Sequence, residues 1–304
     1  MKETAGLWDK KDWPLYFLAC NMRNLIVRSL GENDPILIAV NELSRDEAAQ
    51  SAEGILTKQS TPVLLDSGVY WLATEHARKH NISMDEALAL APERIDNFDW
   101  LLTLYLKMVA RYESRLWGYI EIDQGGRENK IKTRTMLEAK GLRPIPVYHP
   151  LNDGWDYFDE LAQQYDRICL GNIVMADKPS RRRILATMWE RRRKYPHLWI
   201  HGLGMTPRDM TLAYMMNSFD SSSWLTGVRF GETAAATINL GMAVLMNGFD
   251  YRRDLPIEHE GGHTKGTRLC AYSAVMLGHS LRAYRKAIES ELGADVGLFD
   301  VDHG

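Results

Sequence analysis

The clearest pattern along the chain is an alternation between short apolar runs and longer stretches of helical periodicity, which starts near residue 35. Seven runs are rich in β-branched and aromatic residues, at residues 36–40, 63–65, 119–122, 145–148, 168–170, 198–201 and, more weakly, 218–219. Several are apolar at nearly every position, as strands covered on both faces are. Strands that alternate with helices are typical of a parallel sheet. The pattern predicts an α/β protein of the (β/α)8 TIM-barrel class, with an eighth strand at residues 227–230.

The segments between the predicted strands carry helix signals. Ser83 and Glu86 are spaced as a capping box, and apolar residues recur at helical spacing over residues 95–112. Further helices are expected at residues 130–140, 155–165, 178–194 and 269–292. Because no linker or repeat interrupts the chain, we expect a single barrel domain over residues 35–304 that ends in a C-terminal helix. Residues 1–34 are expected to form an N-terminal flap across one end of the barrel.

Composition narrows the class of protein. The chain has 304 residues, of which 45% are hydrophobic and 25% charged, close to the average for a globular protein, which argues against disorder and coiled coil. No apolar run reaches the roughly 18 residues of a membrane span, and the first residues do not resemble a signal peptide. Three widely separated cysteines suit a reducing compartment. We therefore expect a cytoplasmic protein with no membrane partner.

The charge balance limits how the chain could bind nucleic acid. Its 37 basic and 40 acidic residues give a formal net charge of −3, unlike the strongly basic balance of a dedicated nucleic-acid-binding domain. A nucleic-acid partner would need a local basic patch, and the helix expected at residues 178–194 offers one through Arg181, Arg182 and Arg192. A solvated outer helix face explains the same charges equally well, so both interpretations stay open.

Polar residues and glycines stand at the carboxyl ends of the predicted strands, where barrel enzymes have their active sites. They are Asp66-Ser67-Gly68, Asp123-Gln124, His149, Gly171-Asn172, His201-Gly202-Leu203-Gly204 and Asp220-Ser221-Ser222-Ser223. A single aspartate at such a place would be explained by capping of the next helix. Three aspartates together with glycines, which let a flat ligand approach the backbone, favour a functional site.

Five of these segments, in the same order, resemble the tRNA-guanine transglycosylases and their phage and bacterial relatives that put 7-deazaguanines into DNA. The segment Asp66-Ser67-Gly68-Val69-Tyr70 resembles the family's Asp-Ser-Gly-Gly-Tyr/Phe, and residues 119–123 are similar to the strand whose last aspartate reads guanine. Leu170-Gly171 is similar to the family's Gly-Gly, residues 201–207 to Met-Gly-Val-Gly-x-Pro, and residues 218–221 to Met-Phe-Asp-Cys. The resemblance implies a barrel enzyme that exchanges bases in nucleic acid.

The resemblance covers about residues 61–231, and its departures from the family indicate which branch to expect. Family members that act on tRNA hold structural zinc through Cys-x-Cys-x-x-Cys and a distant histidine, and this chain has no such cysteine cluster. We therefore expect no zinc-binding subdomain and no metal. The sequence Asp220-Ser221-Ser222-Ser223-Trp224 is more similar to the phage-type DNA branch than to the cysteine-containing tRNA form. The implied acceptor is DNA, in a bacterial or phage-infected cell, with tRNA as the alternative.

The resemblance also implies roles for the three aspartates. Asp220 would attack the sugar carbon C1′ and form a covalent glycosyl-enzyme intermediate, while Asp66 would act as general acid and base, as the two carboxylates of retaining glycosidases do. Asp123 would accept hydrogen bonds from the guanine edge. No cofactor is implied, because the 7-deazaguanine base, such as 7-cyano-7-deazaguanine, is a substrate. Homodimers are common in the family, but without the zinc subdomain a different dimer or a monomer is equally open.

Further base-binding residues implied by the resemblance are Ser67, Tyr70, His149, Gly171, Asn172, His201, Gly202 and Leu203. The backbone N–H of Gly171, with His149 or Ser67, would donate to the carbonyl oxygen of the base. Tyr70 would stack on the base, unless it is an ordinary core tyrosine. His201 stands where the family has methionine, which leaves the identity of the 7-substituent open.

Other patterns leave alternatives open. Arg229 is similar to a family arginine that contacts phosphate, although a salt bridge at the barrel rim is the simpler interpretation. His259-Glu260-Gly261-Gly262-His263 matches the metalloprotease pattern His-Glu-x-x-His, but adjacent glycines disfavour the helix that this motif needs, so we expect a loop. A barrel glycosidase or nucleosidase would use the same aspartates with water as acceptor. A nucleic-acid-binding accessory subunit would have no need of both Asp66 and Asp220.

Overall fold

The centre of the computed structural model, which describes residues 15–19, 35–44, 62–206, 214 and 216–225, is a sheet of eight parallel strands. The sheet order is β4-β3-β2-β1-β8-β7-β6-β5. The strands are β1 (Leu15–Ala19), β2 (Ile36–Ala39), β3 (Val63–Asp66), β4 (Gly118–Tyr119), β5 (Val147–Tyr148), β6 (Arg167–Leu170), β7 (Trp199–Gly202) and β8 (Ser218–Ser221). A parallel bridge between Ile120 and Ile145 joins the two end strands and closes the sheet. The predicted α/β TIM-barrel class is confirmed.

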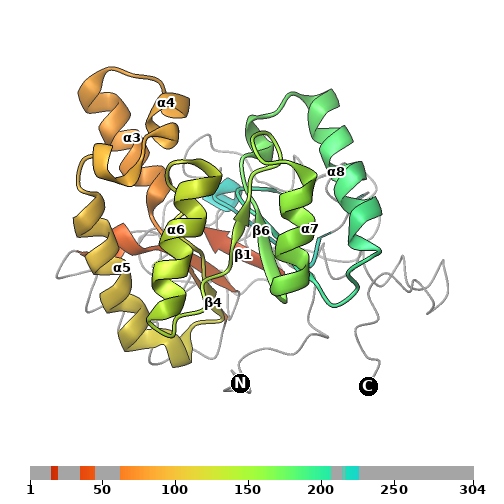
Figure 1. Cartoon of the computed structure of the whole chain (residues 1–304), viewed down its shortest axis with the longest axis horizontal. Coiled ribbons are helices and arrows are strands. Elements are labelled where there is room, and N and C mark those ends of the chain that lie inside the picture. Colours follow the sequence, from red (N-terminus) through yellow and green to blue (C-terminus); the bar gives the residue numbers. More distant parts are fainter. Residues whose placement is uncertain (1–14, 20–34, 45–61, 207–213, 215, 226–304) are drawn as a thin grey trace, which may run out of the picture.

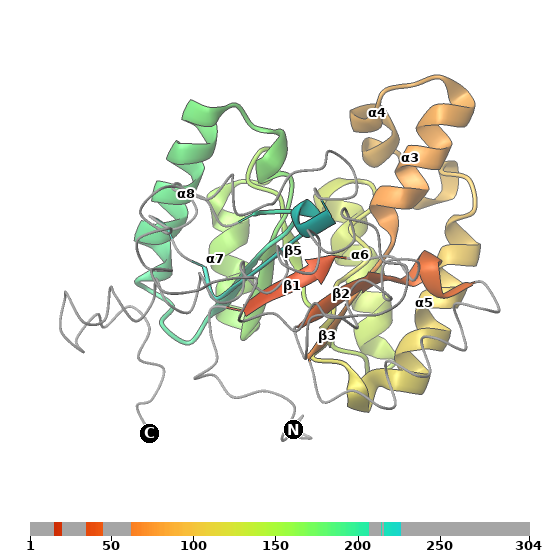
Figure 2. The same ribbon diagram turned by 180° about the vertical axis from the view of Figure 1, so that it is seen from behind.

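Helices follow several of the strands and cover the sheet from outside. Figure 1 shows α5, α6, α7 and α8 around one side of the strands, and Figure 2 shows β1, β2 and β3 from behind. The α-helices are α3 (Val69–His80), α4 (Met84–Ala89), α5 (Phe98–Tyr112), α6 (Gly126–Ala139), α7 (Trp155–Gln164) and α8 (Lys178–Arg192). Short 3-10 turns are η3 (Val40–Ser44), η4 (Pro92–Arg94), η5 (Glu113–Arg115), η6 (Ile173–Met175) and η7 (Ser223–Leu225).

Local sequence signals account for the helix ends. The predicted capping box is present at the start of α4, where the Ser83 side chain accepts from the backbone N–H of Glu86 and the Glu86 carboxylate accepts from that of Ser83. The predicted apolar stripe buries one side of α5. Helix α6 begins at Gly126, earlier than the predicted residue 130, because Gly125 adopts a left-handed φ of 82° that turns the chain directly into the helix.

The first strand corrects one prediction. Leu15–Ala19 was expected to lie in a flap, but it is strand β1, paired in parallel with β2 on one side and β8 on the other. Its five-residue apolar sequence follows Pro14 and is buried over almost its whole length, which explains why it enters the sheet. The predicted eighth strand at 227–230, the predicted helix at 269–292, Arg229 and the segment 259–263 lie outside the described residues.

Aromatic rings pack inside the barrel between strands that are distant in sequence. Phe17 of β1 lies 5.1 Å from Trp117, whose ring lies 5.7 Å from that of Trp199 in β7. Burial of such large side chains supplies much of the favourable free energy of folding. Among the described residues, no helix is both long and apolar enough to cross a membrane.

Candidate active site

Three aspartates stand at strand ends on the same rim of the barrel. Asp66 ends β3, Asp123 follows β4, and Asp220 lies in β8. Burial, helped by the negative charges of Asp123 and Asp220, raises the pKa of Asp66 to about 7, even though hydrogen bonds from the backbone N–H groups of Gly68 and Ser67 oppose the rise. The three carboxylates are therefore close enough to interact, and Asp66 can hold a proton near neutral pH.

Asp220 is held by two hydrogen bonds on one of its oxygens. Its Oδ1 lies 3.1 Å from His201 Nε2 and accepts from the backbone N–H of Gly204 at 2.9 Å. Gly204 has a φ of 65°, a left-handed conformation that favours glycine and that orients this N–H. Oδ2 of Asp220 accepts no hydrogen bond from any of the described residues. The carboxylate is therefore held in place through Oδ1, while Oδ2 is available to react.

A buried chain of hydrogen bonds fixes the ring of His201. Trp199 Nε1 donates to Ser218 Oγ at 2.8 Å, and the same hydroxyl lies 2.8 Å from His201 Nδ1. An indole N–H can only donate, so Ser218 Oγ accepts the hydrogen bond from Trp199. The Ser218 hydroxyl can then donate its own hydrogen bond to His201 Nδ1. We assign the imidazole hydrogen to Nε2 on this basis, where it points at Asp220.

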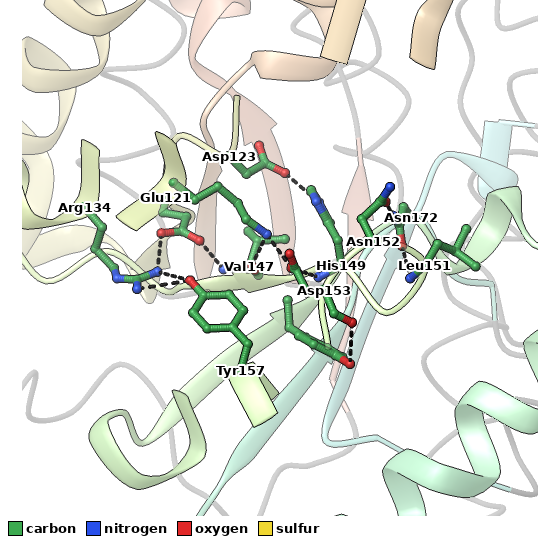
Figure 3. A network of polar contacts seen from close by, with 12 residues as sticks. Glu121, Asp123, Arg134, Val147, His149, Leu151, Asn152, Asp153, Tyr157 and Asn172 are labelled. Atoms are coloured by element: carbon green, nitrogen blue, oxygen red, sulfur yellow. Dashed lines mark hydrogen bonds and ion pairs between the residues drawn. The ribbon is translucent and has the colours of Figure 1, made fainter. Parts of the chain in front are cut away.

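Asp123 is paired with His149, and Figure 3 shows the network behind this pair. Asp123 Oδ2 lies 3.1 Å from His149 Nε2. The backbone N–H of His149 donates to Asp153 Oδ2, which also accepts from the fully buried ammonium of Lys130 at 2.7 Å. Burial alone would raise the pKa of Asp123, but the hydrogen bond and charge of His149 and the charge of Lys130 outweigh it, and this pKa lies below its usual value.

Gly171 makes room for that pair and corrects a prediction. A Cβ at this position would lie 2.6 Å from His149 Cδ2, so only glycine lets the imidazole pack here. The backbone N–H of Gly171 was expected to bind the base, but it donates to the carbonyl of Tyr148 at 2.9 Å. Because the parallel ladder between β5 and β6 uses this donor, the prediction of a free Gly171 N–H is wrong.

A second ion pair lies behind β4, on the side of α6. Arg134 donates to Glu121 Oε2 at 2.7 Å and to Tyr157 Oη, and Glu121 Oε1 accepts from the backbone N–H of Val147 at 2.6 Å (Figure 3). Burial raises the pKa of Glu121 to about 7, even though the charges of Arg134 and Lys130 oppose this rise. Glu121 thereby ties β4, β5 and α6 together.

The other predicted base-binding residues also lie at strand ends. Ser67 is buried directly after β3, Gly202 ends β7, and Leu203 follows it. Tyr70 is 70% exposed in the first turn of α3, so it is not a core tyrosine. Asn172 binds Asn152 through its side-chain amide and so belongs to the loops after β5 and β6. Whether any of them binds a base stays a prediction.

The basic helix is only partly exposed. Arg192 is 1% exposed and donates to Asn217 Oδ1 at 2.8 Å, so its prediction as a nucleic-acid contact is wrong. It shares the buried stripe of α8 with Leu185 and Met188, and burial lowers its pKa to about 9. Arg181 donates to the carbonyls of Val174 and Ala176. Arg182 is exposed, and its contact with nucleic acid stays a prediction.

Sequence reasoning missed several residues that build the site. Tyr16 reaches the end of β8, where its hydroxyl lies 2.7 Å from Ser221 Oγ. Lys130, Asp153 and Ser218 support the paired side chains from behind, as described above. Only Tyr16 had a usable sequence signal, the apolar run around it, because no local pattern pairs Lys130 with Asp153 or Ser218 with His201.

The fold and the strand-end carboxylates define an α/β barrel of the TIM-barrel class with a polar site at the carboxyl ends of its strands. No protein-family model matches the chain, and no curated protein matches it. A solved structure described as a candidate fructose-1,6-biphosphate aldolase from Coccidioides immitis is similar at 11% identity with a TM-score of 0.38, over 91% of this chain and 92% of that one.

Proposed function

We propose that this protein is a base-exchange transglycosylase that replaces guanine in DNA with a 7-deazaguanine through a covalent aspartyl-glycosyl intermediate. One observation supports it above all: Asp66, with a pKa of about 7, stands near Asp220, whose Oδ1 is held while Oδ2 is left to react. Such a pair combines a proton carrier with a nucleophile, which retaining exchange at a sugar carbon requires. The sequence resemblance to transglycosylases supplies the substrate class.

The proposed reaction has two halves that use the same groups in reverse order. In the first, Asp220 Oδ2 attacks C1′, the bond from C1′ to guanine N9 breaks, and protonated Asp66 gives its proton to the leaving base. In the second, the carboxylate of Asp66 takes the proton from N9 of the incoming 7-deazaguanine. That nitrogen then attacks C1′ and releases Asp220, so the sugar keeps its configuration.

Recognition of the base is assigned to Asp123 and His149. Their contact at 3.1 Å puts an N–H donor beside a carboxylate acceptor at the rim of the barrel. Each of the two side chains is 19% exposed. Guanine carries the complementary pair, a carbonyl oxygen next to N1–H and the exocyclic amine. In the proposal Asp123 accepts from N1–H and the amine, and His149 donates to the carbonyl oxygen in place of Gly171.

The test incubates the protein with duplex DNA or with tRNA, each together with 7-cyano-7-deazaguanine, and identifies the digested nucleosides by mass spectrometry. A modified deoxynucleoside supports the proposal. A modified ribonucleoside would assign the enzyme to the tRNA branch, guanine release without incorporation would make it a hydrolase, and no change in either substrate would overturn the proposal. Asp66→Asn and Asp220→Asn should abolish exchange, while the exposed Asp156→Asn serves as the matched control.

A further inference from the structure

Two histidines and an aspartate that play no part in the proposed reaction lie together at the end of α3. His76 and His80 are one helical turn apart, with ring centroids separated by 4.2 Å. Asp96 comes from the segment between η4 and α5, and its Oδ2 lies 3.6 Å from His76 Nδ1 and 2.8 Å from His80 Nε2. Each side chain offers one ligand atom, and the three atoms lie within 4.8 Å of one another.

These spacings suit a small divalent transition-metal ion. Bonds of about 2 Å from zinc to nitrogen or oxygen, at a tetrahedral angle, place neighbouring ligand atoms about 3.3 Å apart. The distances from Asp96 Oδ2 to the two imidazoles lie on either side of this value, and the exposed ring of His80 can adjust. Two imidazoles and one carboxylate form a set that zinc and similar metals accept, whereas calcium and magnesium prefer oxygen ligands alone.

The hydrogen bonds of the cluster already give His76 Nδ1 a lone pair that can bind a metal and place the ammonium of Lys79 beside Asp96. The backbone N–H of Asp96 donates to His76 Nδ1 at 3.0 Å, so this nitrogen is unprotonated, and metal binding would exchange that bond for a metal–nitrogen bond. Asp96 Oδ2 accepts from Lys79 Nζ at 2.8 Å, and the bonds from Lys79 and His80 lower the pKa of Asp96 to about 2. The exposed Lys79 therefore supplies the positive charge that a metal would replace.

A cavity of about 290 Å³ gives access to the cluster. His76 and Asp96 line it together with Trp71, Glu75 and Asn97. A metal with three protein ligands keeps at least one position for water or a small anion, as open zinc sites do. The cavity provides space for such a ligand on the side of α3.

We propose that His76, His80 and Asp96 form a binding site for a divalent transition metal of the zinc type, in which Lys79 competes with the metal for Asp96. The site does not depend on the proposed transglycosylase activity, because none of its residues touches the carboxylates at the strand ends. Its effect on the molecule would be to fasten the end of α3 to the segment that precedes α5.

The test is zinc binding to the metal-free 304-residue chain, measured by competition with a chromogenic chelator. His80→Ala removes an exposed ligand and should weaken binding by more than about tenfold, the lower end of what loss of even a supporting residue costs. Lys79→Met should bind zinc more tightly, and His197→Ala, an exposed histidine outside the cluster, should bind as the unchanged chain does. All variants are compared in a His263→Ala background, because His259 and His263 offer further imidazoles.

Two results would overturn the proposal. One is the absence of zinc binding in the chain with the cluster intact, and the other is equal affinity in that chain and in His80→Ala. Thermal unfolding gives a second readout that needs no enzyme activity, since a ligand that binds only the folded state raises the melting temperature. Zinc should raise it more in the chain with the cluster intact than in His80→Ala, and equal shifts would contradict the assignment.

Discussion

His201 controls how Asp220 is presented at the rim of the barrel. The family that the sequence resembles has methionine at this position, which cannot donate a hydrogen bond, whereas His201 contacts Asp220 Oδ1 at 3.1 Å. The imidazole is fully buried and is oriented by Ser218 and Trp199. In the proposed reaction His201 is therefore a positioning residue, which holds the carboxylate of Asp220 in one rotamer and would stabilise its charge when the proposed glycosyl intermediate breaks down.

Replacement of His201 tests this role. In the base-exchange assay, His201→Leu should lower kcat by about a hundredfold with little change in KM, the scale seen when one charge-stabilising donor is lost. His201→Gln can still donate to Asp220 and should stay within about tenfold of the unchanged enzyme. If both variants lose activity equally, while melting at the same temperature as the unchanged protein, donation to Asp220 is not what His201 contributes.

Asp66 should make the stability of the protein depend on pH in a defined direction. Its pKa is raised to about 7, mainly by burial, so the folded state holds a proton between about pH 4 and 7 that the unfolded state has lost. The contribution of Asp66 to stability is thus full below pH 4 and is lost as the pH rises through 7. Asp66→Asn should equal the unchanged protein at pH 4 and exceed it at pH 8, as measured by denaturant unfolding.

The matched control for this experiment is Asp156→Asn. Asp156 is exposed, and the hydrogen bond from Arg127 lowers its pKa, so its contribution is present at neutral pH and is lost on acidification. Asp156→Asn should show no gain in stability at pH 8. A gain of the same size in both variants would mean that the effect of Asp66→Asn comes from net charge and not from burial.

The three aspartates of the site could be predicted from sequence because carboxyl ends of parallel strands share one rim. The residues that hold them could not, because no local pattern connects Gly204 with Asp220, Ser218 with His201, or Lys130 with Asp153. The error at Arg192 was avoidable at the residue scale. Its spacing from Leu185 and Met188 is that of a single helix face, which indicates burial in spite of its charge.

At the scale of elements, β1 shows where sequence patterns are ambiguous. The seven predicted strands are confirmed, and their apolar runs belong to the alternation of strand and helix patterns that starts near residue 35. Leu15–Ala19 has the same apolar character, but no predicted helix precedes it and the alternation begins only after it. Its register with β8 places Phe17 beside Asp220, so this strand supports the site directly.

Phe17→Ala should therefore destabilise the whole barrel. The side chain is fully buried against Trp117 and the ring of His201, and removal of a buried phenylalanine ring costs about 3–5 kcal/mol. Urea unfolding followed by tryptophan fluorescence measures the loss. Trp100→Ala, at an exposed position on α5, is the control and should change stability little. A small effect at Phe17 would instead fit a peripheral flap.

At the scale of the whole molecule, the barrel is weakest at the seam between β4 and β5. Each of these strands has two residues, and one bridge, between Ile120 and Ile145, joins them. Glu121 compensates by accepting the backbone N–H of Val147, and Arg134 of α6 neutralises its charge inside the protein. Closure of the barrel thus depends on a buried ion pair as well as on strand pairing.

Arg134→Met should destabilise the protein by about 3–5 kcal/mol at pH 8, because it leaves the Glu121 carboxylate buried without its partner. Burial already raises the pKa of Glu121 to about 7, and without Arg134 the folded state would take up a proton more readily still, so the loss should shrink toward pH 5. Glu121→Gln keeps an acceptor for Val147 but carries no charge. The double variant of Arg134→Met and Glu121→Gln should therefore recover most of the lost stability in urea titrations. If it is as unstable as Arg134→Met alone, packing of the arginine, and not its charge, closes the seam.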